Sequence, residues 1–96
     1  MDFLLNLFKG VSNETRLRIL ERMISKGEGS VESIAKELKL PYKTIEWNLK
    51  VLEKSGLVSR RTWGGIAYFS VVDSTSLKYN HSIYNMIKMR MQSKKT

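Results

Sequence analysis

The chain has 96 residues, enough for one domain with a single hydrophobic core but too few for two. It carries 17 basic and 9 acidic residues, and the formal net charge of +8 points to a polyanionic partner, either nucleic acid or an anionic membrane surface. Cysteine is absent, which excludes disulfides, thiolate metal sites and a cysteine nucleophile, and fits an intracellular protein.

The chain is expected to begin with two helices. Residues 2–9 carry four large apolar side chains on about two turns, too many for a free tail, so they should pack on the core or on a second subunit. These are Phe3, Leu4, Leu7 and Phe8. Gly10 interrupts the pattern, and Ser12 or Asn13 is expected to cap a second, well-buried helix that runs to about Lys26. Its basic positions, interpreted as a solvated or ion-paired flank, are Arg16, Arg18 and Arg22.

Two short amphipathic helices joined by a few residues come next, an arrangement typical of a helix-turn-helix. Ser30 either caps the first of them or belongs to a short strand with Val31. The second spans residues 41–55, with Pro41 at its first position and Gly56 as its C-terminal cap. Its apolar stripe consists of Ile45, Leu49 and Leu52, and its opposite face carries Lys43, Trp47, Lys50 and Lys54.

The polar face of residues 41–55 suits a helix lying in a DNA groove, which needs cations for phosphates and a few side chains for base edges. The N-terminal half of such a helix usually enters the major groove deepest. The expected DNA contacts on it are Tyr42, Lys43, Thr44, Glu46, Trp47, Lys50 and Lys54. One alternative is a solvated face on which Glu46 pairs with Lys50 or Lys43. Another is that the indole of Trp47 folds back onto the protein.

The sequence changes from a helical to an alternating period after Gly56. The pair Gly64-Gly65 predicts the two-residue turn of a β-hairpin between residues 57–63 and 66–72. The register across this turn sets Val58 opposite Val71, Arg60 opposite Phe69, and Thr62 opposite Ala67. The side chains expected to face the core are Val58, Phe69 and Val71, and those expected to face outward are Arg61, Trp63 and Ile66.

A hairpin that directly follows such a helix is a wing, here residues 58–72. Arg60, Arg61 and Trp63 could place two cations and an aromatic ring against the DNA backbone or in a minor groove. The alternative is an edge hairpin whose charges protect it from pairing with other strands.

A last helix is expected to start at a cap formed by Asp73 or Ser74 and to reach about Ser93. Its apolar repeat, which suits packing on a partner helix, consists of Leu77, Tyr84, Ile87 and Met91. One small core can hardly absorb both apolar ends of the chain. Residues 2–9 and 75–93 are therefore predicted to form a dimer interface.

The runs that carry a resemblance to a known family are 13–20, 30–38, 44–45, 49–53, 56–58 and 68–71, together with Gly65. In this order, over residues 11–72, they resemble winged helix-turn-helix regulators of the ArsR type, and small archaeal members most of all. The resemblance implies a mainly α fold with a small β-hairpin, in the order α-α-(β)-α-α-β-β-α. It also implies a homodimer on a pseudo-palindromic DNA site, with the first and last helices at the dimer interface.

The chain departs from this family where members sense metals. Residues 27–35 read GEGSVESIA where sensor members have cysteines, and His81 has no acid after Asp73 in its helix, so no metal site is expected. Glu46 and Asn48 stand where the family often has Ser and His, so its base preference does not transfer.

We therefore expect one domain, residues 1–96, that binds double-stranded DNA as a homodimeric, sequence-specific transcriptional regulator of the repressor kind in the cytoplasm. The alternatives are a non-specific architectural or chromatin protein and a winged-helix adaptor that binds protein through the Trp47 face. No cofactor or catalytic residue is expected, because no nucleophile–base pair is visible, and no small-molecule effector is assigned. No membrane span or signal peptide is expected, because no apolar run approaches the ~20 residues of a span and the acid at position 2 argues against a signal peptide. A membrane-surface role is not expected either, because the cations of the last helix are scattered and not confined to one polar face.

Overall fold

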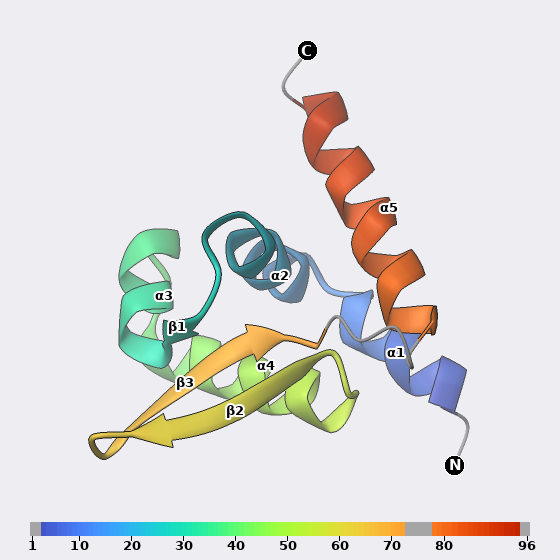
Figure 1. The fold of residues 1–96 in the computed structure, drawn as a ribbon. Coiled ribbons are helices and arrows are strands. Elements are labelled where there is room, and N and C mark those ends of the chain that lie inside the picture. Colours follow the sequence, from blue (N-terminus) through green and yellow to red (C-terminus); the bar gives the residue numbers. More distant parts are fainter. Residues whose placement is uncertain (1–2, 73–77, 95–96) are drawn as a thin grey trace.

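The structure, a computed structural model, describes residues 3–72 and 78–94. Helices and strands in this part follow the predicted order (Figure 1). They are α1 (Phe3–Val11), α2 (Glu14–Lys26), β1 (Gly29–Ser30), α3 (Val31–Leu38), α4 (Tyr42–Lys54), β2 (Val58–Trp63), β3 (Ile66–Val71) and α5 (Lys78–Lys94). The predicted fold, mainly α with a small β-hairpin, is confirmed.

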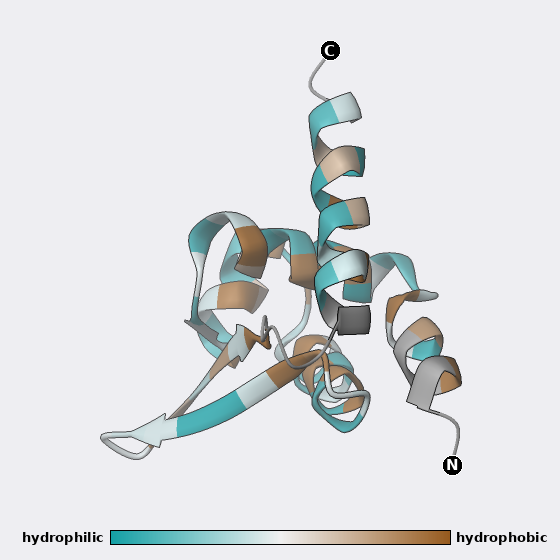
Figure 2. Ribbon diagram, turned by 45° about the vertical axis from the view of Figure 1, so that its right-hand side comes forward, coloured by the Kyte–Doolittle hydropathy of each residue, from teal (hydrophilic) through white to brown (hydrophobic). Residues whose placement is uncertain are grey.

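Helix α2 is the centre of the fold, and α1, α3, α4 and α5 all contact it. It begins at Asn13, whose side chain accepts a hydrogen bond from the Arg16 backbone N–H at 3.1 Å, so Asn13 and not Ser12 is the cap. Its core face is completely buried at Ile19 and Leu20. Figure 2 shows hydrophobic segments in the helices of the body, whereas β2 becomes hydrophilic along its middle.

The sheet is antiparallel, with strand order β1-β3-β2. The hairpin has the predicted register, with Val58 opposite Val71 and Arg60 opposite Phe69. Ser30 is both a cap and a strand residue, but its strand is formed with Gly29, and Val31 already begins α3. Ser30 pairs with Tyr68 of β3, and its hydroxyl accepts a hydrogen bond from the Ser33 N–H that caps α3.

Gly10 lies inside α1 and does not end it, contrary to the prediction. It is buried, and a Cβ atom at this position would lie 2.7 Å from Leu57 Cδ1 and 3.0 Å from Ser55 Oγ. Glycine therefore serves close packing of α1 against the α4–β2 junction, a use that its place in the sequence did not reveal.

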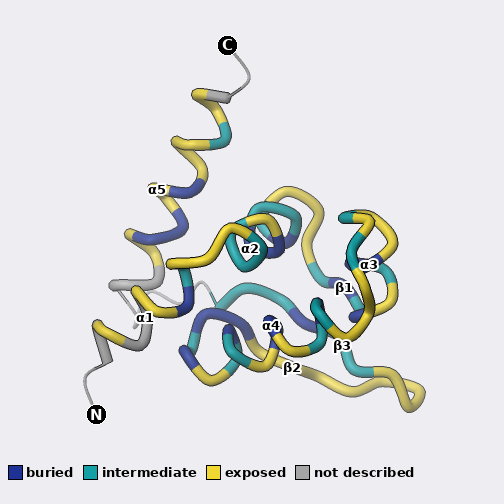
Figure 3. Tube along the Cα trace, turned by 180° about the vertical axis from the view of Figure 1, so that it is seen from behind, coloured by how far each residue is buried: buried dark blue, intermediate teal, exposed yellow. Residues whose placement is uncertain are grey.

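Helix α5 packs on α2 and extends beyond the helical body at its C-terminal end (Figures 1 and 3). Tyr84 and Ile87, expected at a dimer interface, are instead buried in the core of their own chain, with 1% and 5% of their surface exposed. The Tyr84 hydroxyl donates to the Leu57 carbonyl, which satisfies the polar tip of a buried ring. The expected caps Asp73 and Ser74 lie outside the described residues.

Candidate nucleic-acid interface

The turn between α3 and α4 is fixed by backbone hydrogen bonds and by α2. Lys39 adopts the left-handed conformation, with φ of 57°, and the Leu40 N–H donates to the Ala35 carbonyl at 3.1 Å. From α2, Arg18 Nη2 donates to the Leu38 carbonyl at 3.0 Å. Helices α3 and α4 are thus held at a defined angle to each other.

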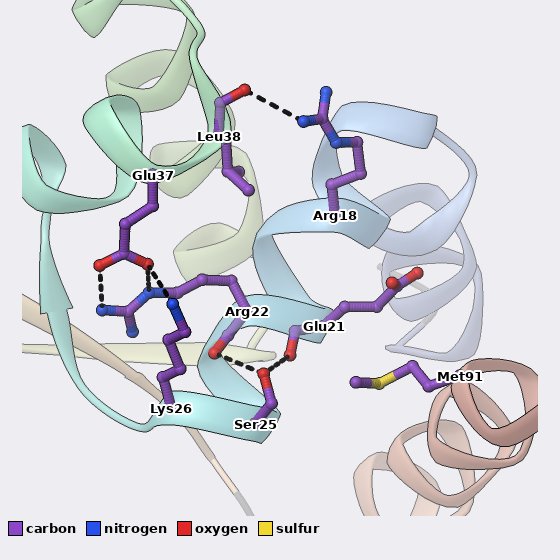
Figure 4. Close-up of a pocket in the computed structure, with 8 residues that line it drawn as sticks. All are labelled: Arg18, Glu21, Arg22, Ser25, Lys26, Glu37, Leu38 and Met91. Carbon is purple, nitrogen blue, oxygen red and sulfur yellow. Dashed lines mark hydrogen bonds and ion pairs between the residues drawn. The ribbon is translucent and has the colours of Figure 1, made fainter. Parts of the chain in front are cut away.

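A second contact of α2 clamps α3 (Figure 4). Arg22 donates through Nε and Nη2 to both carboxylate oxygens of Glu37, at 2.7 and 3.1 Å, and Lys26 Nζ lies 3.8 Å from the same carboxylate. The hydrogen bonds from Arg22 hold the pKa of Glu37 below its ordinary value, against a smaller opposing effect of burial. The expected ion-paired flank of α2 therefore exists, with its partner on another helix.

Helix α4 buries one face completely, through Ile45, Leu49 and Leu52. Asn48 lies on the same side and is 7% exposed, with its Nδ2 donating to the Thr44 carbonyl and its Oδ1 accepting from Arg16 Nη1 at 3.0 Å. Asn48 therefore anchors α4 to α2 and has no surface for reading a base.

Both ends of α4 have recognisable caps. Pro41 is the N-cap and not the first helical residue, so the helix starts at Tyr42, one position later than predicted. At the other end Gly56 has φ of 81°, and its N–H donates to the Glu53 carbonyl while that of Leu57 donates to the Leu52 carbonyl. This pair of bonds is a Schellman motif in which Ser55 is the C-cap and Gly56, the glycine expected to end the helix, follows it in the left-handed conformation.

The opposite face of α4 is exposed. Its exposed side chains are Tyr42, Lys43, Trp47, Lys50 and Lys54, and Thr44 and Glu46 are half-buried beside them. Trp47 keeps 66% of its surface exposed, so its indole does not fold back onto the protein. Glu46 forms no ion pair with Lys43 or Lys50. The surface thus combines cations and aromatic rings with one unpaired carboxylate.

The wing, β2 and β3, lies beside α4 and ends in a narrow turn (Figure 1). Gly64 and Gly65 both have positive φ, 58° and 79°, as a two-residue hairpin turn of type I′ requires. Trp63 and Ile66 flank this turn and are 70% and 50% exposed.

The two wing arginines lie on opposite faces of the hairpin, and each meets a carboxylate. Arg60 Nη2 is 2.9 Å from Glu53 of α4, and its guanidinium lies over the Phe69 ring. Arg61 donates through Nε and Nη2 to Glu28, at 2.6 and 2.7 Å. This bidentate pair lowers the pKa of Glu28 and raises that of Arg61.

Sequence reasoning missed the long-range partners at this site. Arg16 donates to Asn48 and also to the carbonyls of Lys9 and Gly10, so one guanidinium joins α1, α2 and α4. The arginines on several sides of α2 indicated that this helix has polar partners. The spacing of residues in the sequence does not say which element each side of the helix contacts.

The residues expected at the dimer interface are only partly described. The side chains of Phe3, Leu4 and Leu7, and Leu77 as a whole, lie outside the described residues. Phe8 is 49% exposed and Met91 is half-buried. An apolar groove between α1, α2 and α5 is lined by Phe8, Val11, Leu17, Ile83, Met86, Ile87 and Arg90.

In the part of the chain that the structure describes, no three His, Cys, Asp or Glu side chains gather closely enough to hold a metal ion. None of the helices described is both long and apolar enough to cross a membrane.

Residues 11–61 match the model of a family described as a helix-turn-helix domain. A curated relative, the uncharacterized HTH-type transcriptional regulator MJ1325 of Methanocaldococcus jannaschii, is 37% identical over 67 residues, which cover 70% of this chain and 75% of the relative. The chain belongs to the helix-turn-helix family of transcriptional regulators.

Solved structures agree with this membership. A homodimeric winged helix-turn-helix DNA-binding domain from Mycobacterium bovis, named as a possible ArsR-family transcriptional regulator, is 25% identical with a TM-score of 0.78. The match covers 95% of this chain and 80% of that domain. The transcriptional repressor PagR of Bacillus anthracis is 22% identical with a TM-score of 0.75, covers 91% of both chains, and shows the shared fold.

Proposed function

We propose that this regulator binds double-stranded DNA in a sequence-specific way, as a homodimer and as a repressor. Helix α4 lies in the major groove, and the wing lies on the backbone or in the minor groove beside it. Acting on DNA, such a protein, of the small archaeal type, works in the cytoplasm.

One observation carries this proposal: α4 buries one face completely and exposes cations and aromatic rings on the other. Lysines supply phosphate contacts, and the first turns supply side chains for base edges. The proposed contacts are Tyr42, Lys43, Thr44, Glu46, Trp47, Lys50 and Lys54 on α4, and Arg60, Arg61 and Trp63 on the wing. The clamps from α2 support the proposal, because they hold this face rigid. Arg60 and Arg61 are each paired with a carboxylate, so a phosphate contact by either guanidinium would compete with that carboxylate or be made beside it.

Dimerisation is proposed through α1 and α5. The Mycobacterium bovis domain is homodimeric, and here the apolar groove between the terminal helices offers a surface for a second copy. Two copies related by a twofold axis would place their α4 helices on successive turns of one DNA face, which matches a pseudo-palindromic site.

Selection from random duplexes, followed by footprinting, tests the proposal. The selected and a random duplex are then titrated at rising salt. A specific regulator should prefer its selected site by about 10³-fold or more, with an affinity that falls steeply as salt rises. Equal affinities for the selected and the random duplex would favour a non-specific architectural protein. No binding to any duplex would favour a protein adaptor.

A further inference from the structure

The tip of the wing is apolar. Trp63 and Ile66 are directly paired across the hairpin turn, and both keep half or more of their surface exposed. The turn between them consists of Gly64 and Gly65, and nothing lies within 4 Å of a Cβ atom built on either. In Figures 1 and 3 this tip projects beyond the helices. The wing therefore ends in a narrow, largely exposed apolar edge, with open space around both glycines of its turn.

The cations of the wing lie behind this tip and have partners within the chain. Arg60 pairs with Glu53 on one face of the hairpin, and Arg61 pairs with Glu28 on the other. Each guanidinium also covers an aromatic ring, those of Phe69 and Tyr68, at 5.2 and 5.5 Å from the ring centroid. The hairpin is thus braced on both faces, so its tip is presented in one direction.

The positive charge around the tip favours DNA as its partner. The chain carries a net charge of +8, and β2 contacts α4, whose exposed face is basic. Two side chains are too few for a stable protein interface, which buries about 1,000 Å² or more. The minor groove of B-DNA, about 6 Å wide, instead admits a narrow edge without side chains at its turn.

We propose that the Trp63–Ile66 tip enters the minor groove beside the site read by α4 and rests as an apolar wedge against a base step. This inference rests on the proposed DNA binding and specifies how the wing takes part in it. Apolar wedges partly unstack a base step and bend the duplex toward the major groove. An apolar contact neutralises no phosphate, so it adds affinity without adding to the salt dependence.

Three variants test the wedge on the selected duplex. Trp63→Ala removes the ring, Trp63→Phe keeps an aromatic wedge, and Ser59→Ala is the control on the same face of β2. Trp63→Ala should weaken binding about tenfold at every salt concentration and leave the slope of affinity against salt unchanged. The Phe variant should retain most of the affinity, and the Ser59 variant all of it. Because Trp63 is 70% exposed, the thermal unfolding midpoint should not move.

A second readout locates the wedge. 2-Aminopurine, whose fluorescence rises when it is unstacked, is placed at successive positions flanking the selected site. The wild-type protein should raise the fluorescence at one step, and Trp63→Ala should not. Unchanged affinity in Trp63→Ala, or no response at any position, would overturn the wedge while α4-dependent binding stands. Failure of the wild-type protein to bind any duplex would instead overturn the proposed function itself.

Discussion

Side chains on the exposed face of α4 are expected to divide the work of DNA recognition. Lys43 can donate to guanine, and Glu46, which has no ion pair with a neighbouring lysine, can accept from the N4 amino group of cytosine. Each good base contact is worth about 1–3 kcal/mol of discrimination. Lys43→Ala or Glu46→Ala should therefore change the preferred base at one position, as a repeated selection from random duplexes would show.

Lys50 and Lys54, farther along the same face, serve as the matched comparison. As phosphate contacts, they should lower affinity for all duplexes alike when replaced by Ala, and reduce the salt slope by about one phosphate each. If all four variants lost affinity equally for every duplex and kept the selected consensus, α4 would position the protein on DNA without reading bases.

Glu28 is expected to compete with DNA for Arg61. It occupies the Nε–Nη2 edge of the guanidinium, which is the edge best suited to a bidentate phosphate contact. Glu28→Gln should therefore tighten binding to every duplex several-fold and raise the salt slope by about one phosphate.

The control separates this exchange from a general change of charge. Glu32→Gln removes an exposed acid from α3 and should have a smaller effect. In an Arg61→Gln background, Glu28→Gln should no longer tighten binding. An equal gain in both backgrounds would mean that Glu28 acts only through net charge.

At the scale of elements, the angle between α2 and α3 depends on the Arg22–Glu37 pair. The pKa of Glu37 is lower in the folded chain than its ordinary value of 4.5, so the pair stabilises the fold above that pH. Its contribution is lost as the pH falls through the lowered pKa. Glu37→Gln should lower the thermal unfolding midpoint at pH 7, and this difference should shrink below about pH 4.5. Glu32→Gln, in the same helix, is the control, and a difference that persists in acid would contradict the pair's role.

Elements with local signals were predictable from the sequence, and contacts between elements were not. Gly64-Gly65 predicted the hairpin register, because a two-residue turn leaves only one way to pair the strands. Ser30 was predictable as a cap, because a serine hydroxyl can accept a hydrogen bond from the first turn of a helix. Gly10 was misread because the Leu57 side chain that excludes a Cβ atom comes from a distant part of the chain. The exposed face of α4 was correctly placed, whereas the carboxylates that hold Arg60 and Arg61 were not foreseen.

At the scale of the whole molecule, α5 carries a buried apolar stripe and further apolar side chains outside that stripe, two sets that the periodicity did not separate. Tyr84 and Ile87 fill the core of their own chain, while Met86 and Met89 remain 57% and 66% exposed. A stripe shows that a helix face will be covered, but the covering surface is determined by the tertiary fold. The proposed interface therefore moves from the buried pair to exposed residues of the same helix.

The dimer is tested by charging that exposed surface. Phe8 and Met86 line the same groove and are 49% and 57% exposed, so Phe8→Glu with Met86→Glu should leave the protomer folded but place acids in the proposed interface. Sedimentation should show a wild-type dimer at ~10 μM, a concentration that corresponds to about −7 kcal/mol of association, and a monomer for the double variant. The monomer should also bind the selected site more weakly, because it engages one half-site at a time.

The control is Ile66→Ser, which changes an exposed apolar residue of the wing and should leave the protein dimeric. A wild-type monomer at tens of micromolar, or a double variant that stays dimeric, would show that α1 and α5 do not form the interface.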